Sequence, residues 1–128
     1  MYNQYALKKP ERISLQREIE RLFKQGEGFI SHPMRVVYLE QKPLSGATVS
    51  VLISVPKRKV RLAVKRNRMK RLIREAYRLN KTHLIKRLQE KNSGLLIAFL
   101  FVGNEIYHRD TIEKSMQKAI KTLIEKTE

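Results

Sequence analysis

An unbroken apolar run at residues 95–102 (Leu-Leu-Ile-Ala-Phe-Leu-Phe-Val) constrains the fold of this chain more than any other feature. A strand with one face in water alternates apolar and polar residues, whereas this run has no polar position. A membrane-spanning helix needs about 18 apolar residues, so the run is too short to be one. We therefore predict a central strand that is buried on both faces.

The hydrophobic periodicity of the remaining chain predicts helices and three more strands. The expected helices cover residues 14–24, about 62–79 and 111–126, with 81–91 as a possible extension of the second, and the expected strands cover 29–31, 35–40 and 48–55. The order is then α-β-β-β-α-β-α. We predict an α+β fold in which helices pack on a sheet of about four strands. At 128 residues the chain is expected to form one domain, with residues 1–13 as a flexible arm.

Local signals refine three of these elements. Ser14 is the expected N-cap of the first helix, and turn chemistry marks residues 42–46. Asp110 and Glu113 have the spacing of a capping box at the start of the last helix. The expected buried face of the long helix carries Leu62, Met69, Ile73 and Ala76. The last helix has an apolar stripe at Ile112, Met116, Ala119, Ile120, Leu123 and Ile124.

Positive charge is concentrated in the middle of the chain. Lys and Arg number 28 against 12 Asp and Glu, which gives a net charge of +16. Residues 41–74 contain no acid, and ten bases lie between Lys57 and Arg74. A solvated helix face normally mixes Glu with Lys, and this segment does not. The forked guanidinium group of arginine matches the geometry of phosphate oxygens. Nucleic acid is the predicted partner, with anionic lipid as the alternative.

Catalytic chemistry is not evident in the sequence. The acids are scattered, the three histidines lack metal-ligand or triad spacing, and cysteine is absent. A nuclease that works alone usually clusters carboxylates around metal ions. We therefore predict no catalytic residue and no metal site in this chain. The lack of cysteine also fits a cytoplasmic protein.

The acid-free segment carries a recognisable motif. Residues 63–76 read A-V-K-R-N-R-M-K-R-L-I-R-E-A. This run closely resembles the RNR signature of the bacterial ribonuclease P protein component. The early Lys9-x-Glu11-Arg12-Ile13 and a first helix that ends Phe23-Lys24-x-Gly26 are also similar to that family. The resemblance spans nearly the whole chain.

The resemblance implies a protein subunit of a ribonucleoprotein endoribonuclease. Such a protein binds a catalytic RNA and the 5′ leader of precursor tRNA. The RNA removes the leader with Mg²⁺, and no membrane or obligate protein partner is involved. The family fold also implies a left-handed β-α-β crossover, an exception to the usual right-handed rule.

Site residues follow from the resemblance position by position. The implied RNA-binding residues are Lys57, Arg58, Lys59, Arg61, Arg66, Asn67, Arg68, Lys70, Arg71 and Arg74. The implied leader cleft, between the first helix and the sheet, contains Ile19, Phe23 and Tyr38. The chain departs from the family at Ile19, where Phe is usual, and at Arg61, where Gly is usual. We further expect Arg66 and Arg68 to contact RNA rather than support the fold.

Other classes fit the residues less well. A ribosomal or other structural RNA-binding protein shares the charge and size, and only the ordered RNR signature separates it. A leucine-zipper basic region would need leucine heptads after the basic helix, which are missing after Ala76. A stand-alone nuclease lacks its carboxylates. A membrane-surface helix would need apolar residues free to insert, whereas Leu62 and Ile73 are expected in a core.

Overall fold

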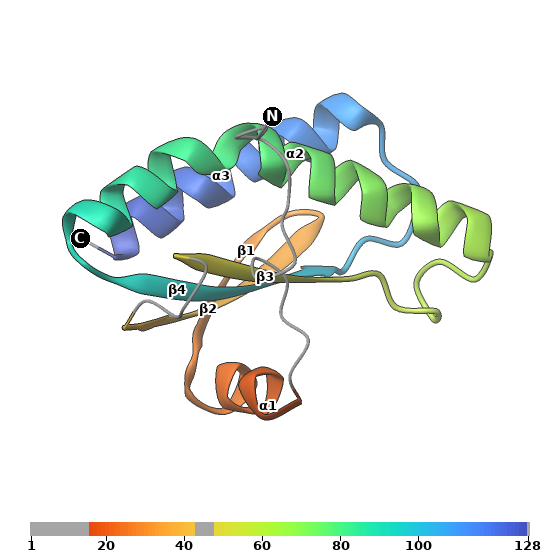
Figure 1. Ribbon diagram of the computed structural model, residues 1–128. Helices are drawn as coiled ribbons and strands as arrows, with labels where there is room; N and C mark the ends of the chain where they lie inside the picture. The colour runs from red at the N-terminus through yellow and green to blue at the C-terminus, as the bar shows by residue number, and fades with distance from the viewer. Residues whose placement is uncertain (1–15, 43–47, 128) are drawn as a thin grey trace, which may run out of the picture.

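The computed structural model describes residues 16–42 and 48–127 (Figure 1). Its elements are α1 (Gln16–Gln25), β1 (Glu27–Ser31), β2 (Met34–Gln41), β3 (Val49–Ser54), α2 (Ala63–Glu90), β4 (Gly94–Phe101) and α3 (Arg109–Lys126). The predicted order of helices and strands is confirmed. The expected Ser14 cap, the arm at residues 1–13 and most of the turn at 42–46 lie outside the described residues.

Four strands form one mixed sheet in the order β1-β2-β4-β3. β2 pairs antiparallel with β1 and with β4, and β3 pairs parallel with β4. The apolar run therefore forms an inner strand, and seven of the eight β4 residues are buried. Parallel neighbours need a crossover connection, which α2 supplies between β3 and β4. The left-handed sense of this crossover stays a prediction of the family resemblance.

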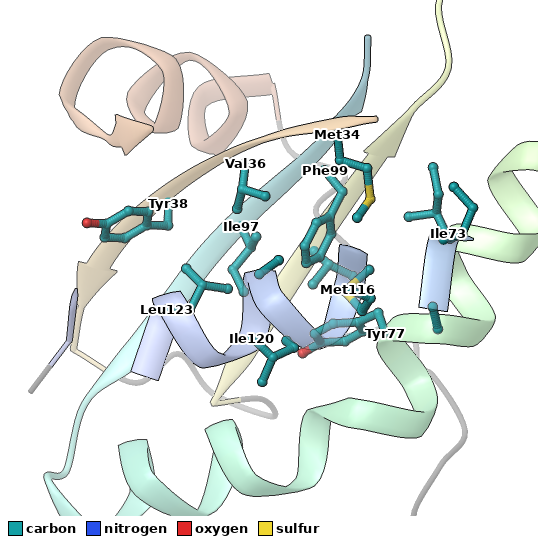
Figure 2. Close-up of a cluster of buried hydrophobic side chains, with 14 of the residues drawn as sticks. Met34, Val36, Tyr38, Ile73, Tyr77, Ile97, Phe99, Met116, Ile120 and Leu123 are labelled. Atoms are coloured by element: carbon teal, nitrogen blue, oxygen red, sulfur yellow. The ribbon is translucent and has the colours of Figure 1, made fainter. Parts of the chain in front are cut away.

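Helices cover both faces of the sheet. α2 and α3 lie side by side on one face, and α1 packs on the other (Figure 1). Because side chains alternate along a strand, β2 serves both layers. Met34, Val36 and Tyr38 join the large core under α2 and α3, whereas Val37 joins the smaller cluster under α1. Figure 2 shows the large core, where β2 and β4 side chains meet Met116, Leu123 and their neighbours on the helices.

α2 is longer than the sheet that it covers. Its 28 residues form one unbroken helix, so the suggested extension over 81–91 is confirmed. At 1.5 Å per residue the helix is about 42 Å long. The eight residues of β4 span about 27 Å at roughly 3.3 Å each. The N-terminal end of α2 projects past the sheet (Figure 1), and its first buried residue is Met69.

The placement of Leu62 in the core is wrong. Leu62 precedes the helix and is 61% exposed, while Met69, Ile73 and Ala76 are buried as predicted. Helical periodicity misplaced Leu62 because no sheet lies beneath the projecting end of α2. The membrane-surface class was disfavoured partly because of Leu62, and that reason no longer holds.

The capping box on the last helix is also wrong. α3 begins at Arg109, with His108 at the N-cap position, and the backbone N–H groups of Thr111 and Ile112 donate to the His108 carbonyl. Asp110 instead lies in the first turn, where its charge complements the helix dipole. The Glu113 Oε1 atom accepts from Asn80 Nδ2 of α2 at 2.9 Å. The Glu113 carboxylate, which a capping box would need at the start of α3, is thus hydrogen-bonded to another helix. The predicted apolar stripe of α3 is confirmed, with five members buried and Ile124 partly buried.

Candidate nucleic-acid interface

A short turn between β3 and α2 presents the first basic residues. Val55 and Val60, each 4% exposed, anchor its two ends in the core. The backbone N–H groups of Lys59 and Val60 donate to the Pro56 carbonyl at 3.0 and 3.1 Å. With both ends fixed, Lys57 and Arg58 stand in solvent. The fold therefore holds two cations outward at a defined position.

Lys59 points from this turn to the loop after β4. Its Nζ atom donates to Asn104 Oδ1 at 3.0 Å. An ammonium has three donors, so this bond leaves two for an anion. Lys59 thus braces two loops and still contributes charge to the surface.

Arg66 has a structural role that the sequence did not suggest. Its Nη1 atom donates to the backbone carbonyls of Val60 at 3.3 Å and Arg61 at 3.1 Å. These bonds fasten the turn to the first turn of α2, and Arg66 is half-buried as a result. The expectation that Arg66 does not support the fold is therefore wrong. A guanidinium has five N–H donors, so others remain for phosphate.

The projecting end of α2 exposes most of the signature. Among the implied RNA-binding residues, Lys57, Arg58, Arg61, Asn67, Arg68, Arg71 and Arg74 are exposed, and Lys59, Arg66 and Lys70 are half-buried. Met69 and Ile73 alternate with them and pack into the core. The structure thus gathers the ten predicted residues on one turn and one helix end. We call this set the α2 basic surface.

The α2 basic surface lacks local neutralisation. No carboxylate in residues 16–42 and 48–127 forms an ion pair with its nine cations. Its nearest acid along the helix, Glu75, binds Arg78 at 2.6 Å. That hydrogen bond holds the pKa of Glu75 below its usual value and raises the pKa of Arg78. Arg78 is therefore engaged within the protein, whereas the cations before it are available to a polyanion.

The predicted leader cleft is brought together only in part. Ile19 packs under α1 against the sheet, and the neighbouring Phe23 is 46% exposed. Tyr38 lies on the opposite face of the sheet, in the core with Met34 and Val36 (Figure 2). Its assignment to the cleft is wrong, because strand alternation sends it toward α3.

The hydroxyl of Tyr38 is committed within the protein. It donates to Glu27 Oε2 at 2.9 Å, and the Phe29 ring lies 6.1 Å from the Tyr38 ring. Burial, the hydrogen bond to Glu27 and nearby negative charge raise the pKa of Tyr38 to about 12. Tyr38 is therefore a core residue that fastens β2 to β1.

The sequence did not identify other residues on the face of the sheet that α1 covers. Leu52 of β3 and Leu100 of β4 are half-buried against the α1 cluster. Arg35 is exposed and pairs in register with Leu100. The signal that could have found Arg35 is its even spacing from Val37, since residues two apart on a strand share a face. Leu52, Leu100 and Arg35 thus lie on the sheet face that α1 covers, and Phe23 is exposed on α1 itself.

The described residues contain no cluster of three or more His, Asp or Glu side chains able to hold a metal ion. Among the histidines, the His32 ring hydrogen-bonds the Tyr107 hydroxyl, and His108 occupies the N-cap position of α3 through its backbone carbonyl, without a side-chain capping bond. In the same part of the chain, none of the helices has the length and apolar character needed to cross a bilayer.

Comparison with known proteins decides the family. The ribonuclease P family model matches residues 7–126. The chain belongs to the ribonuclease P protein family. A ribonuclease P protein component from Porphyromonas gingivalis is 46% identical over 116 residues, which cover 91% of this chain and 85% of that protein. One from Clostridioides difficile is 31% identical over 87% of this chain and 86% of that protein.

Solved ribonuclease P proteins have the same fold. The Staphylococcus aureus protein aligns with a TM-score of 0.68 at 22% identity, over 88% of this chain and 94% of that one. The Thermotoga maritima protein gives 0.66 at 22% identity, over 88% and 96%. The chain is thus the protein subunit of a ribonucleoprotein endoribonuclease that acts in tRNA processing, and the catalytic RNA is a separate component. The resemblance inferred from residues 63–76 is confirmed.

Proposed function

We propose that the α2 basic surface binds the catalytic RNA of ribonuclease P. The observation that carries this proposal is nine cations on one turn and one helix end, without an ion-paired carboxylate among the described residues. Release of counterions from RNA favours such an interaction. Core contacts of Met69 and Ile73 fix the helix, so little order is lost on binding.

The surface beside α1 is the proposed site for the single-stranded 5′ leader of precursor tRNA. Phe23 offers an aromatic platform, and Arg35 offers a cation on the same face of the sheet. Stacking on an aromatic ring tolerates any base, which suits a leader of variable sequence. Ile19 packs against the sheet, and Phe23 is the only aromatic residue of α1 (Gln16–Gln25).

Mg²⁺ is proposed to act at the RNA. The described carboxylates are dispersed and do not form a candidate metal site. In this proposal the protein chain holds no catalytic group, needs no obligate protein partner and works in the cytoplasm. Its own residues position RNA by charge and stacking, and hydrolysis belongs to the metal-loaded RNA.

Reconstitution tests the proposed function. The purified chain would be mixed with a bacterial ribonuclease P RNA and a 5′-labelled precursor tRNA, at Mg²⁺ concentrations where the RNA alone is nearly inactive. We expect leader release only when both components are present. An Arg68→Ala, Arg71→Ala double variant should need more protein for the same rate. Binding of RNA without restored cleavage would contradict the proposed function.

The leader site has its own matched pair of variants. Phe23→Ala and Leu79→Ala each remove an exposed apolar side chain, since Phe23 is 46% and Leu79 is 41% exposed. Loss of one stacked base costs about 1–3 kcal/mol. Phe23→Ala should therefore weaken binding of long-leader precursor tRNA about 5- to 150-fold, and Leu79→Ala should not. Equal effects on tRNA with and without a leader would contradict the assignment of Phe23.

A further inference from the structure

A groove separate from both surfaces runs between β1 and α3. It has a volume of about 660 Å³. The residues that line it are Ile30, Ser31, His32, Thr111, Lys114, Ser115, Lys118, Lys121, Thr122 and Glu125. β1 is an edge strand, and β3, which leads to the α2 basic surface, forms the other edge. The groove and the α2 basic surface therefore lie on different sides of the domain.

Hydrogen bonds fix the floor of this groove. Ser31 Oγ donates to the Ser115 carbonyl at 2.7 Å, and Ser115 Oγ donates to the His32 carbonyl at 2.5 Å. Both serines are buried, so the pair joins β1 to α3 inside the protein. His32 Nε2 also lies 3.0 Å from the Tyr107 hydroxyl. The groove is thus shaped before any ligand arrives, which lowers the ordering cost of binding.

Three exposed lysines line one wall of the groove. Lys114, Lys118 and Lys121 occupy positions i, i+4 and i+7 of α3. At 1.5 Å rise per residue they form a row about 10 Å long. No carboxylate in the described parts of the chain is ion-paired with them. The one acid of the groove, Glu125, comes one turn after Lys121. A row of unpaired cations fits a linear polyanion better than a single small anion.

We propose that this groove binds a second stretch of RNA phosphodiester backbone, apart from the RNA on the α2 basic surface. The ammonium groups would bind phosphate oxygens, and the hydroxyl of Thr111 adds a hydrogen-bond donor on the same wall, whereas the Thr122 hydroxyl already donates to the Lys118 carbonyl at 2.9 Å. Lysines act here as point charges, so the contact reads no sequence. The inference rests on the proposed RNA-binding function and adds a second side to it. The protein then contacts two separated backbone segments.

Two triple variants of equal charge test the groove. The groove variant carries Lys114→Gln, Lys118→Gln and Lys121→Gln. The control carries Lys42→Gln, Lys86→Gln and Lys126→Gln, at exposed positions outside the groove. Each lowers the net charge from +16 by three. Because all six side chains are exposed, both variants should fold, and circular dichroism would verify this.

The measurement is binding to a transcribed bacterial ribonuclease P RNA over a range of salt concentrations. Each lost phosphate contact should remove roughly 0.7–0.9 from the log–log salt slope. We expect the groove variant to lose about 2–3 units of slope and the control less than about 0.5. Backbone protection of the RNA should disappear at one segment only in the groove variant. Equal slopes for the two variants would overturn the proposal.

Two further measurements complete the test. The first distinguishes an acidic protein from RNA as the occupant of the groove, and the second distinguishes failure of the groove proposal from failure of the proposed function. If the groove variant loses binding to poly-glutamate but keeps the RNA slope, an acidic protein is the occupant and the RNA proposal is overturned. The Arg68→Ala, Arg71→Ala variant tests the proposed function itself. If the salt slope of RNA binding falls for that variant but not for the groove variant, RNA binding by the α2 basic surface is supported and the groove proposal is overturned.

Discussion

The guanidinium of Arg66 and the backbone carbonyl of Arg61 lie 3.1 Å apart, joined by a hydrogen bond from Nη1. The same atom also donates to the carbonyl of Val60. One residue of the basic signature therefore builds the turn that presents its neighbours. Arg68, two positions later, is exposed and has no comparable bond among the described residues. The two arginines of the motif consequently have different roles.

Single substitutions should separate these roles. Arg66→Ala should lower the free energy of unfolding by about 1–2 kcal/mol, because two backbone carbonyls lose their donor. Arg68→Ala should leave stability within about 0.5 kcal/mol and reduce the RNA salt slope by roughly 0.7–0.9. Urea unfolding and RNA binding would measure both. Arg66→Lys is the control, because it keeps the positive charge without the forked guanidinium donors. Equal stability of Arg66→Ala and Arg68→Ala would contradict the structural role of Arg66.

The position of Tyr38 predicts a stability effect without a leader effect. Tyr38→Phe removes the hydrogen bond to Glu27 and should destabilise the protein by about 1–3 kcal/mol, since a bond to a charged group is lost. Leader affinity should stay unchanged because Tyr38 faces the core under α3. Thermal unfolding and precursor-tRNA binding would be compared with those of Phe23→Ala. A selective loss of leader affinity in Tyr38→Phe would return this residue to the cleft.

Tyr38 should also titrate late. Burial and the hydrogen bond to Glu27 raise its pKa from 10.0 to about 12. Since the folded pKa is above the unfolded one, the stabilisation is complete below pH 10 and is lost as the pH rises toward 12. The phenolate absorbance of the protein minus that of Tyr38→Phe isolates this group from the other four tyrosines. Ionisation with a midpoint near the ordinary value of 10.0 would show that the hydroxyl is free.

The projecting end of α2 predicts unequal costs for two apolar truncations. Met69→Ala removes a fully buried side chain and should cost about 2–5 kcal/mol. Leu62→Ala removes a side chain that is 61% exposed and should cost less than about 0.5 kcal/mol. Denaturant unfolding of both variants gives the comparison. A large loss of stability at Leu62 would mean that the start of α2 packs against the body of the protein.

Most of the secondary structure was predictable because its causes are local. The run at residues 95–102 is apolar at every position and short, which predicted the inner strand that β4 forms. The α3 stripe repeats with the helical period, and five of its six members are buried. The basic signature identified the family because it is an ordered run of residues, readable without any fold. These features depend on neighbours in the chain.

Only the tertiary structure decided which surface each side chain reaches. The sequence placed Tyr38 on a strand, but the proposed leader cleft would lie on the face that α1 covers, and Tyr38 faces the opposite side of the sheet. Glu113 was assigned to its own helix end, yet Asn80 of α2 donates to it. Leu62 has the helical spacing of a buried residue, but the sheet does not extend beneath the end of α2 that it precedes. In each case the deciding partner is remote in sequence, and its position depends on strand register, sheet order and helix length acting together.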